Sequence, residues 1–334
     1  MTNAFPAWLD GLRREARAPA ILLGVWLLTV AVSLPLALGL RGMLEQHLGS
    51  SLAADTAASG VNYDWWQEFS DQASGLGVTF RPTIIGFAAV LDNMSAFIDN
   101  DHRPVVIVGA ATAYIVLWIF LAGGIIDRYA RNRATRAHGF FSACGVFFFR
   151  FLRLAVVMWA VYALLFSYLH PWLFGDLFPR MTRDFTVERS AFLVRLGLYA
   201  VFGLLLAACN VVFDYAKVQA VVEDRRSMIG AIRAAIGFVT RNAGAVALVY
   251  LLNVLLFLIV LALYAIVAPG AGTGGLSTWM ALVVGQIYIL ARLWVKLVFW
   301  ASETSLFQSR LAHAGYVAAP APTWPDSPEA EAIR

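Results

Sequence analysis

Two basic residues stand inside the last apolar stretch of this 334-residue chain, where burying a charge in lipid is costly. Arg292 and Lys296 are four residues apart and share one face of a helix, and Glu303 follows on roughly the same face. Such a basic face could form a pocket for an anionic lipid head group. The alternative is that these residues pair with acids of neighbouring helices, for which Asp127, Asp214 and Glu303 are the candidates.

Two further sets of polar residues are candidates for a site. The basic set could also meet anionic lipid: Arg150, Arg153 and Arg233. The set of polar groups expected within or beside the membrane is Asp127, Asn210, Asp214, Asn253, Gln286 and Glu303. No nucleophile is paired with a base at a recognisable spacing, and no metal-binding or phosphate-binding motif is present. The sequence therefore predicts no catalytic residue, no metal and no cofactor.

The composition predicts the membrane-spanning helices that must position these residues. Apolar residues make up 60% of the chain and charged residues only 14%, against about a quarter in soluble domains. This composition excludes an ordinary cytosolic enzyme and a disordered protein. Six stretches reach the ~20 apolar residues that cross a bilayer, and all must be helical. They are residues 19–40, 104–126, 154–174, 191–213, 243–268 and 279–300. The predicted fold is an all-α polytopic membrane protein.

The distribution of basic residues predicts the orientation of these spans. With the basic segment 1–18 in the cytoplasm, sixteen Lys and Arg lie on the inner side and six on the outer side. Cytoplasmic loops carry such an excess, so both termini are expected inside. Only two of the 25 basic residues are lysine, an arginine bias typical of GC-rich bacterial genomes. We therefore expect a bacterial cytoplasmic (inner) membrane.

The longest connection is an outer loop, residues 41–103, with eight acids and three arginines. Its apolar part, residues 84–98, is too short to span and predicts a re-entrant or surface-lying helix. Trp65 and Trp66 are candidate interface anchors. The loop could bind a protein partner, whereas nothing indicates nucleic acid. The proline-rich tail, residues 314–334, is expected to be disordered.

The two inner connections resemble each other. Asp127-Arg128-Tyr129 and Asp214-Tyr215 each end a span and lead through basic sequence into an amphipathic helix, at residues 140–151 and 229–239. A weaker third copy follows the last span at residues 303–313. This pattern predicts a repeated unit with three amphipathic helices on the cytoplasmic side, their apolar stripes packed on the bundle and their arginines near anionic lipid.

The segment Val221-Val222-Glu223-Asp224, with the following residues Ala231, Ala234, Ala235, Phe238 and Arg241-Asn242, carries a family resemblance. It resembles the bacterial six-helix membrane domain that accompanies glycerophosphodiester phosphodiesterases. The resemblance covers residues 104–313 and implies a six-helix, non-catalytic membrane domain. No region outside the spans is long enough for the phosphodiesterase barrel, and the acidic outer loop departs from the family pattern.

Three function classes follow, and each makes a different structural prediction. A non-catalytic module that binds lipid or a partner is the main hypothesis. A transporter of a small molecule or lipid requires a continuous polar cavity that reaches the midplane, lined by residues such as Asn253 and Gln286. An intramembrane enzyme acting on a lipid requires a titratable pair within hydrogen-bond reach in a pocket.

Overall fold

The computed structural model describes residues 4–49, 51–58, 62–82, 84–101, 104–268, 270 and 276–311. Every regular element in these ranges is a helix, and six helical segments are long and apolar enough to cross a membrane. The prediction of an all-α polytopic membrane protein is therefore confirmed. The predicted disordered tail lies outside the described residues, as does Arg103 of the outer loop.

Most of the spanning segments are longer than the apolar stretches that predicted them. They are α2 (Pro19–Leu48), α6 (Val105–Arg131), the segment Ala137–Thr182, α9 (Glu188–Val222), α11 (Ala243–Val267) and α12 (Leu276–Arg310). The shorter α-helices are α1 (Ala4–Ala16), α3 (Ala54–Ala58), α4 (Tyr63–Gln72), α5 (Phe87–Ile98) and α10 (Met228–Arg241). A 3₁₀ turn covers Gly77–Thr79.

The third spanning segment changes its hydrogen-bond pattern around a proline. It begins as α7 (Ala137–Leu164), continues as π-helical turns at Leu165–Leu169 and Trp172–Leu177, and ends as α8 (Phe178–Thr182). Pro171 lies between the two π-helical turns. Proline has no N–H and its ring crowds the carbonyl four residues earlier, so the ladder of hydrogen bonds shifts there.

Two of the three expected amphipathic segments are not separate helices. Residues 140–151 belong to α7, and the stretch that begins at Glu303 continues α12 to Arg310. No proline interrupts either stretch, so the span and its polar extension form one helix. The α10 helix is separate because Ser227 begins it, accepting a hydrogen bond from the Gly230 amide at 3.2 Å, and Asn242 divides it from α11.

The face that α10 presents to the bundle differs in part from the prediction. Its buried residues are Met228, Ala231 and Ala235, whereas Ile229 is 76% exposed and Ile236 is 47% exposed. Small alanine side chains let α10 approach the neighbouring α9 closely. Ile229 and Ile236 therefore face away from the bundle, whereas Ile232 and Val239 of the same predicted apolar stripe pack against the core.

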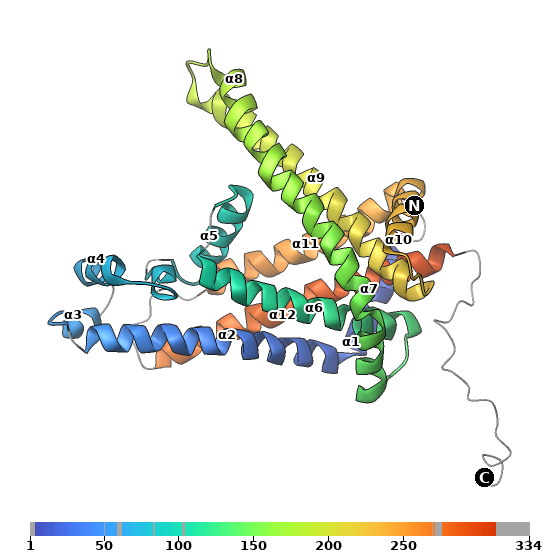
Figure 1. Cartoon of the computed structure of the whole chain (residues 1–334), viewed down its shortest axis with the longest axis horizontal. Coiled ribbons are helices and arrows are strands. Elements are labelled where there is room, and N and C mark those ends of the chain that lie inside the picture. Colours follow the sequence, from blue (N-terminus) through green and yellow to red (C-terminus); the bar gives the residue numbers. More distant parts are fainter. Residues whose placement is uncertain are drawn as a thin grey trace, which may run out of the picture.

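Figure 1 shows two groups of long helices that diverge from a common end. The helices α2, α6, α11 and α12 form the main bundle, and the pair α7 and α9 forms a hairpin that leans away from it. The two groups meet at the end that holds α1 and α10, called the α1 end below. The largest hydrophobic cluster lies mainly at this end, where helices approach through small residues. A Cβ on Gly124 of α6 would lie 2.5 Å from Cys144 Sγ of α7.

The segment 1–18, expected only as a basic extension, contains a helix that docks on α12. A Cβ on Gly11 would lie 2.6 Å from the Ser302 backbone, so the two helices nearly touch. Trp8 Nε1 donates to Asn253 Oδ1 at 3.0 Å, and Arg14 Nη1 donates to the Tyr129 carbonyl at 2.8 Å. These bonds connect α1 to α6 and α11 as well, so α1 is part of the core at this end.

The docking of α1 is expected to depend on pH through Glu15. Burial raises the pKa of Glu15 to about 7, against a smaller opposite effect of a hydrogen bond from Trp294. Between pH 4.5 and about 7, the docked carboxyl therefore holds a proton that the free carboxyl has lost. The free energy of docking becomes less favourable as the pH rises through this range, and above about pH 7 it no longer changes. The full shift corresponds to roughly 3 kcal/mol.

Hydrogen exchange of the α1 amides at pH 5.5 and pH 8 measures this effect once the intrinsic exchange rates are corrected for pH. We expect stronger protection at pH 5.5, and we expect Glu15→Gln to remove the difference. Glu188→Gln, an exposed glutamate at the opposite end of α9, is the control and should keep it. Equal protection of the unsubstituted α1 at both pH values would contradict the prediction.

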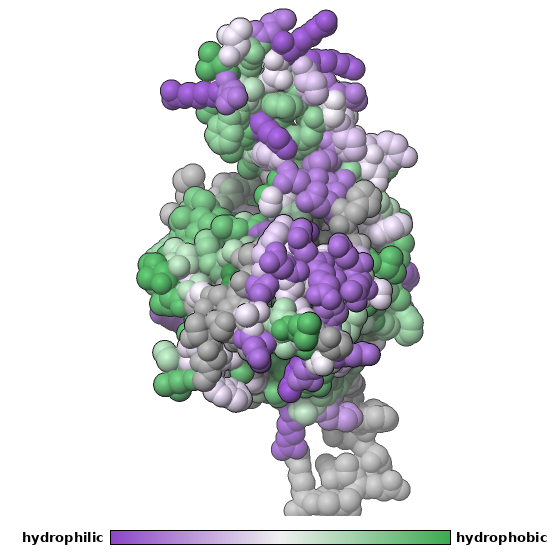
Figure 2. Space-filling model, turned by 90° about the vertical axis from the view of Figure 1, so that its left-hand side faces the viewer, coloured by the Kyte–Doolittle hydropathy of each residue, from purple (hydrophilic) through white to green (hydrophobic). Residues whose placement is uncertain are grey.

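The opposite end of the molecule carries the helices of the loop 41–103. Figure 2 faces this end and shows hydrophilic residues gathered over it and at the hairpin tip. Trp65 is buried against Phe69, and its Nε1 donates to His47 Nδ1 at 3.1 Å. Trp66 Nε1 donates to the Phe80 carbonyl at 3.2 Å. Trp65 is therefore part of a small aromatic core of the loop and is not the exposed interface anchor that the sequence predicted.

The predicted short apolar helix of the loop is α5, which connects the main bundle to the hairpin. At its start Phe87 packs edge-on against Tyr264 of α11, with ring centroids 6.5 Å apart. At its end Asp99 accepts a hydrogen bond from the Tyr199 hydroxyl of α9, and this bond lowers the pKa of Asp99. His170 Nε2 lies 2.9 Å from the last carbonyl of α5. The two diverging groups are thus joined at both ends.

Candidate functional site

A polar cluster surrounds the buried carboxylate of Asp214, near the α1 end of α9. Asp214 accepts hydrogen bonds from Lys217 Nζ at 2.5 Å, Asn210 Nδ2 at 3.0 Å and Trp300 Nε1 at 3.3 Å. Asn210 Nδ2 also donates to the Tyr250 hydroxyl at 3.3 Å. Positions 210, 214 and 217 repeat at helical spacing, so one face of α9 carries three of the five groups.

The two basic residues of α12 lie on the same side as this cluster. Lys296 Nζ lies 3.4 Å from the centre of the Trp118 ring and 5.8 Å from that of Trp300. An ammonium over an aromatic face is attracted by the ring quadrupole. Within the described part of the chain, no ion pair includes Lys296 or Arg292. The expected alternative, pairing with an acid of a neighbouring helix, is therefore not the arrangement in this structure.

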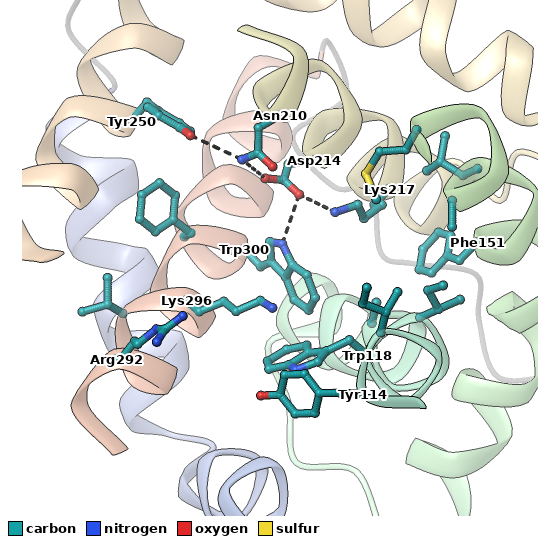
Figure 3. Close-up of a pocket in the computed structure, with 18 of the residues that line it drawn as sticks. Tyr114, Trp118, Phe151, Asn210, Asp214, Lys217, Tyr250, Arg292, Lys296 and Trp300 are labelled. Atoms are coloured by element: carbon teal, nitrogen blue, oxygen red, sulfur yellow. Dashed lines mark hydrogen bonds and ion pairs between the residues drawn. The ribbon is translucent and has the colours of Figure 1, made fainter. Parts of the chain in front are cut away.

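The polar cluster and the α12 cations line one cavity of about 560 Å³. It lies where α7 and α9 of the hairpin converge on α6, α11 and α12 (Figure 3). Its polar lining consists of Asn210, Asp214, Lys217, Tyr250, Arg292 and Lys296. Its aromatic lining consists of Tyr114, Trp118, Phe151, Phe257, Phe299 and Trp300. Three cations face one carboxylate, so the cavity has an excess of positive charge.

The cavity extends from the α1 end toward the middle of the membrane. Arg292 precedes Trp300 by eight residues, which is roughly 12 Å along a helix. Figure 3 shows the side chains of Arg292 and Lys296 directed toward the space between α12 and α6. Both residues are exposed to the cavity, where the ammonium of Lys296 packs over the Trp118 ring. A cavity of this volume is within the range of small-molecule sites.

Four of the sequence candidates meet in this cavity: Asn210, Asp214, Arg292 and Lys296. The acid of the other inner corner does not, because Asp127 pairs with Arg131 at 2.8 Å on its own helix. Gln286 also lies elsewhere, where its Oε1 accepts a hydrogen bond from Trp26 Nε1 at 3.0 Å.

Asn253 lies at the junction of α1, α11 and α12 and is completely buried. Its Oδ1 accepts from Trp8, and its Nδ2 donates to Ser302 Oγ at 2.8 Å. Both the oxygen and the nitrogen of the Asn253 amide are therefore bonded to neighbouring helices. Asn253 holds α1, α11 and α12 together and does not line the cavity. Glu303 is 2% exposed in the same region, and neither of its carboxylate oxygens has a hydrogen-bond partner among the residues that the structure describes.

The basic candidates outside the last span lie at the surface of the α1 end. Arg150 Nη1 pairs with Asp224 at 2.5 Å, and the guanidinium stacks over Phe147. Arg153 Nε donates to the carbonyl of Phe149 and is exposed, and Arg233 is exposed on α10. None of the three lines the cavity.

The sequence predictions missed Lys217 and the aromatic residues of the cavity. Trp118 carried a signal that could have found it. Tryptophan favours the two membrane interfaces, whereas Trp118 stands fourteenth in the 27-residue α6, at the middle of the span. A tryptophan at this depth indicates a polar partner or a cavity.

The fold and the site define this chain as an integral, polytopic, all-helical membrane protein with a cationic, aromatic-lined cavity. No family model, no curated protein and no solved structure matches the chain.

Proposed function

We propose that the protein is a non-catalytic membrane module that binds an anionic amphiphile in the cavity between hairpin and bundle. The observation that carries this proposal is the pair Arg292 and Lys296, two basic side chains within a spanning segment that have no acidic partner among the described residues. An uncompensated cation is costly within a membrane, and a bound carboxylate or phosphate would supply the missing charge.

The rest of the lining suits the apolar part of such a ligand. Trp118 of α6 packs edge-on against Trp300 of α12, with ring centroids 5.5 Å apart, and Phe257 of α11 and Phe299 of α12 add further aromatic surface. The charged and aromatic groups together favour a molecule with one anionic end and a hydrocarbon body. Free inorganic anions would leave the aromatic walls unused.

Transport of the same amphiphile is the second candidate, because the cavity reaches from the α1 end toward the midplane. The expected polar path is incomplete, since Asn253 and Gln286 are bonded elsewhere. An enzyme is less well supported. Asp214 and Lys217 form a titratable pair in the cavity, but the described lining includes no serine, threonine, cysteine or histidine nucleophile.

The same proposal includes a location. The excess of arginine at the α1 end favours a cytoplasmic position for that end, in a bacterial inner membrane with anionic lipid. The resemblance to the membrane domain of glycerophosphodiester phosphodiesterases is part of this proposal. The acidic loop 41–103 is then on the outer side and is the proposed surface for a protein partner.

The double substitution Arg292→Ala plus Lys296→Ala tests the function. We expect the purified variant to carry at least tenfold less anionic amphiphile per protein than the unsubstituted protein. The only cation left in the cavity is then Lys217, which Asp214 neutralises. Mass spectrometry of the extracted lipids measures the amount per protein. Unchanged anionic lipid in this variant would show that the cavity does not bind it.

The matched control is Arg153→Ala plus Arg233→Ala. It removes two exposed arginines from the α1 end, so the change in net charge is the same. We expect this control to keep the bound amphiphile. Equal loss from both double variants would indicate binding by general surface charge and would contradict the cavity. Proteoliposome flux of the identified amphiphile then separates binding from transport.

A further inference from the structure

A second, smaller groove of about 360 Å³ lies at the α1 end, between α2, α6 and the start of α7. Two arginines line it, Arg17 immediately before α2 and Arg128 near the end of α6. None of the residues of the larger cavity belongs to it. The groove is therefore a separate candidate site.

Arg128 is unusual among the basic residues of this end because it is 7% exposed and has no acidic partner among the described residues. Its Nη2 donates to the carbonyl of Arg17 at 3.2 Å, while its Nη1 has no hydrogen-bond partner within the described part of the chain. The neighbouring Arg131, in contrast, is neutralised by Asp127. A guanidinium has five N–H donors, so a buried Arg128 with one bond is missing an acceptor.

The first turn of α7 adds further donors to the groove. Ala137, the first residue of α7, lines the groove, and the side chain of the N-cap residue Arg136 makes no capping hydrogen bond. The first amides of a helix have no intrahelical acceptor and carry a partial positive charge. The groove therefore has hydrogen-bond donors and positive charge from three sources, and the described lining contains no acid.

The groove changes from polar to apolar along its length. The arginines lie at the helix ends, and the deeper lining consists of Gly24, Leu28 and Leu121 within the spanning segments. Leu28 is eleven residues beyond Arg17, roughly 16 Å along a helix. This order matches a lipid in one leaflet, with its phosphate at the interface and its chain toward the midplane.

We propose that this groove binds an anionic phospholipid of the leaflet at the α1 end. Its phosphate lies between Arg17 and Arg128, and one acyl chain follows α2 past Gly24. The recognised chemistry is a phosphate, which a soluble phosphate ester could also supply, so the test includes both sources.

The experiment uses the delipidated full-length chain carrying Arg292→Ala plus Lys296→Ala, so that the larger cavity does not contribute. Native mass spectrometry follows the titration with phosphatidylglycerol, and phosphatidylcholine with the same acyl chains is compared. We expect at least tenfold tighter binding of phosphatidylglycerol, and at least a tenfold loss of that binding on Arg128→Gln. The exposed Arg133→Gln at the same corner is the control and should stay within twofold.

Two milder variants keep the test decisive if Arg128→Gln does not fold. Arg17→Gln changes an exposed side chain and keeps the carbonyl that Arg128 contacts. Gly24→Leu fills the apolar part of the groove, because a Cβ at Gly24 meets nothing within 4 Å. The matched control is Gly42→Leu, at an equally open position on the same helix. We expect both groove variants to weaken phosphatidylglycerol binding at least fivefold, and the control to leave it unchanged.

Each other outcome overturns the assignment. Equal affinity for the two lipids would contradict recognition of net negative charge. Full competition by glycerol 3-phosphate, together with no effect of Gly24→Leu, would assign the groove to a soluble phosphate ester. Since the larger cavity is inactivated throughout, failure here leaves the proposed function intact, and failure of the cavity test leaves this groove intact.

Discussion

Replacing Asp214 by asparagine is expected to lower the free energy of unfolding by about 3 kcal/mol. The substitution keeps the size of the side chain but removes the charge that faces Lys217 at 2.5 Å. Both side chains of this pair are largely buried, with exposed fractions of 8% for Asp214 and 17% for Lys217. An ammonium left there without its partner is strongly destabilising. Thermal unfolding in detergent should show a decrease in Tm of roughly 5–10 °C.

The comparison variant is Asp224→Asn, which breaks the ion pair with Arg150 at the surface of the same end. Asp224 is 54% exposed, and exposed pairs contribute at most about 1 kcal/mol. Asparagine also tolerates the positive φ of this position. The double variant Asp214→Asn plus Lys217→Met should recover part of the loss, because it removes the unpaired charge. A decrease in Tm no larger for Asp214→Asn than for Asp224→Asn would show that the buried pair is not a main source of stability.

Replacing Gly124 by alanine is expected to open the contact between α6 and α7. The added Cβ would lie 2.5 Å from Cys144 Sγ and 2.8 Å from the Phe140 carbonyl oxygen. The carbonyl belongs to the α7 backbone and cannot rotate away, so the two helices must separate. Overpacking of this kind costs about 1–3 kcal/mol. The buried thiol of Cys144 then becomes accessible, and we expect at least tenfold faster maleimide labelling in a Cys209→Ser background.

The matched control is Gly109→Ala on the same helix, where an added Cβ meets nothing within 4 Å. Cys144 should label at the unsubstituted rate in this control, because no helix contact is opened at position 109. The two substitutions change helix propensity in the same way, so a difference in labelling rate reports the contact alone. A maleimide cannot report on a Cys144→Ala rescue, so that double variant is measured by Tm. It should recover only part of the stability, since the Phe140 carbonyl remains. Slow labelling of Gly124→Ala would mean that the helices absorb the extra atom without separating.

Much of the architecture was predictable because membrane insertion is a local property. Whether a stretch such as residues 243–268 crosses a bilayer depends on its own length and apolarity, and α11 covers Ala243–Val267. The helix α1 was not predicted, because its short sequence has no such run and is stabilised by contacts with α12. The buried face of α10 was predicted only in part: Ile232 and Val239 pack on the core, but close packing buries Ala231 and Ala235 most deeply and leaves Ile229 and Ile236 exposed.

The candidate site was predictable in part. Intramembrane charge identified Arg292 and Lys296, because an ionisable residue in a span is recognisable from its position alone. It could not identify which polar residues share a cavity with them. Asp214 and Gln286 were equivalent candidates in the sequence, yet one lines the cavity and the other accepts a hydrogen bond from Trp26.

The sequence by itself thus determined the six spans, their apolar surfaces and the separation of basic from acidic ends, since each follows from the transfer of about 20 residues between water and lipid. Only the tertiary structure decided that the hairpin leans away from the bundle, and that Asp214 meets Trp300, 86 positions away, at the base of the resulting wedge. Contacts of this kind depend on the rotation and tilt of each helix, which are set by small residues such as Gly124 at the crossings. Neither quantity is encoded in the hydropathy of a single span.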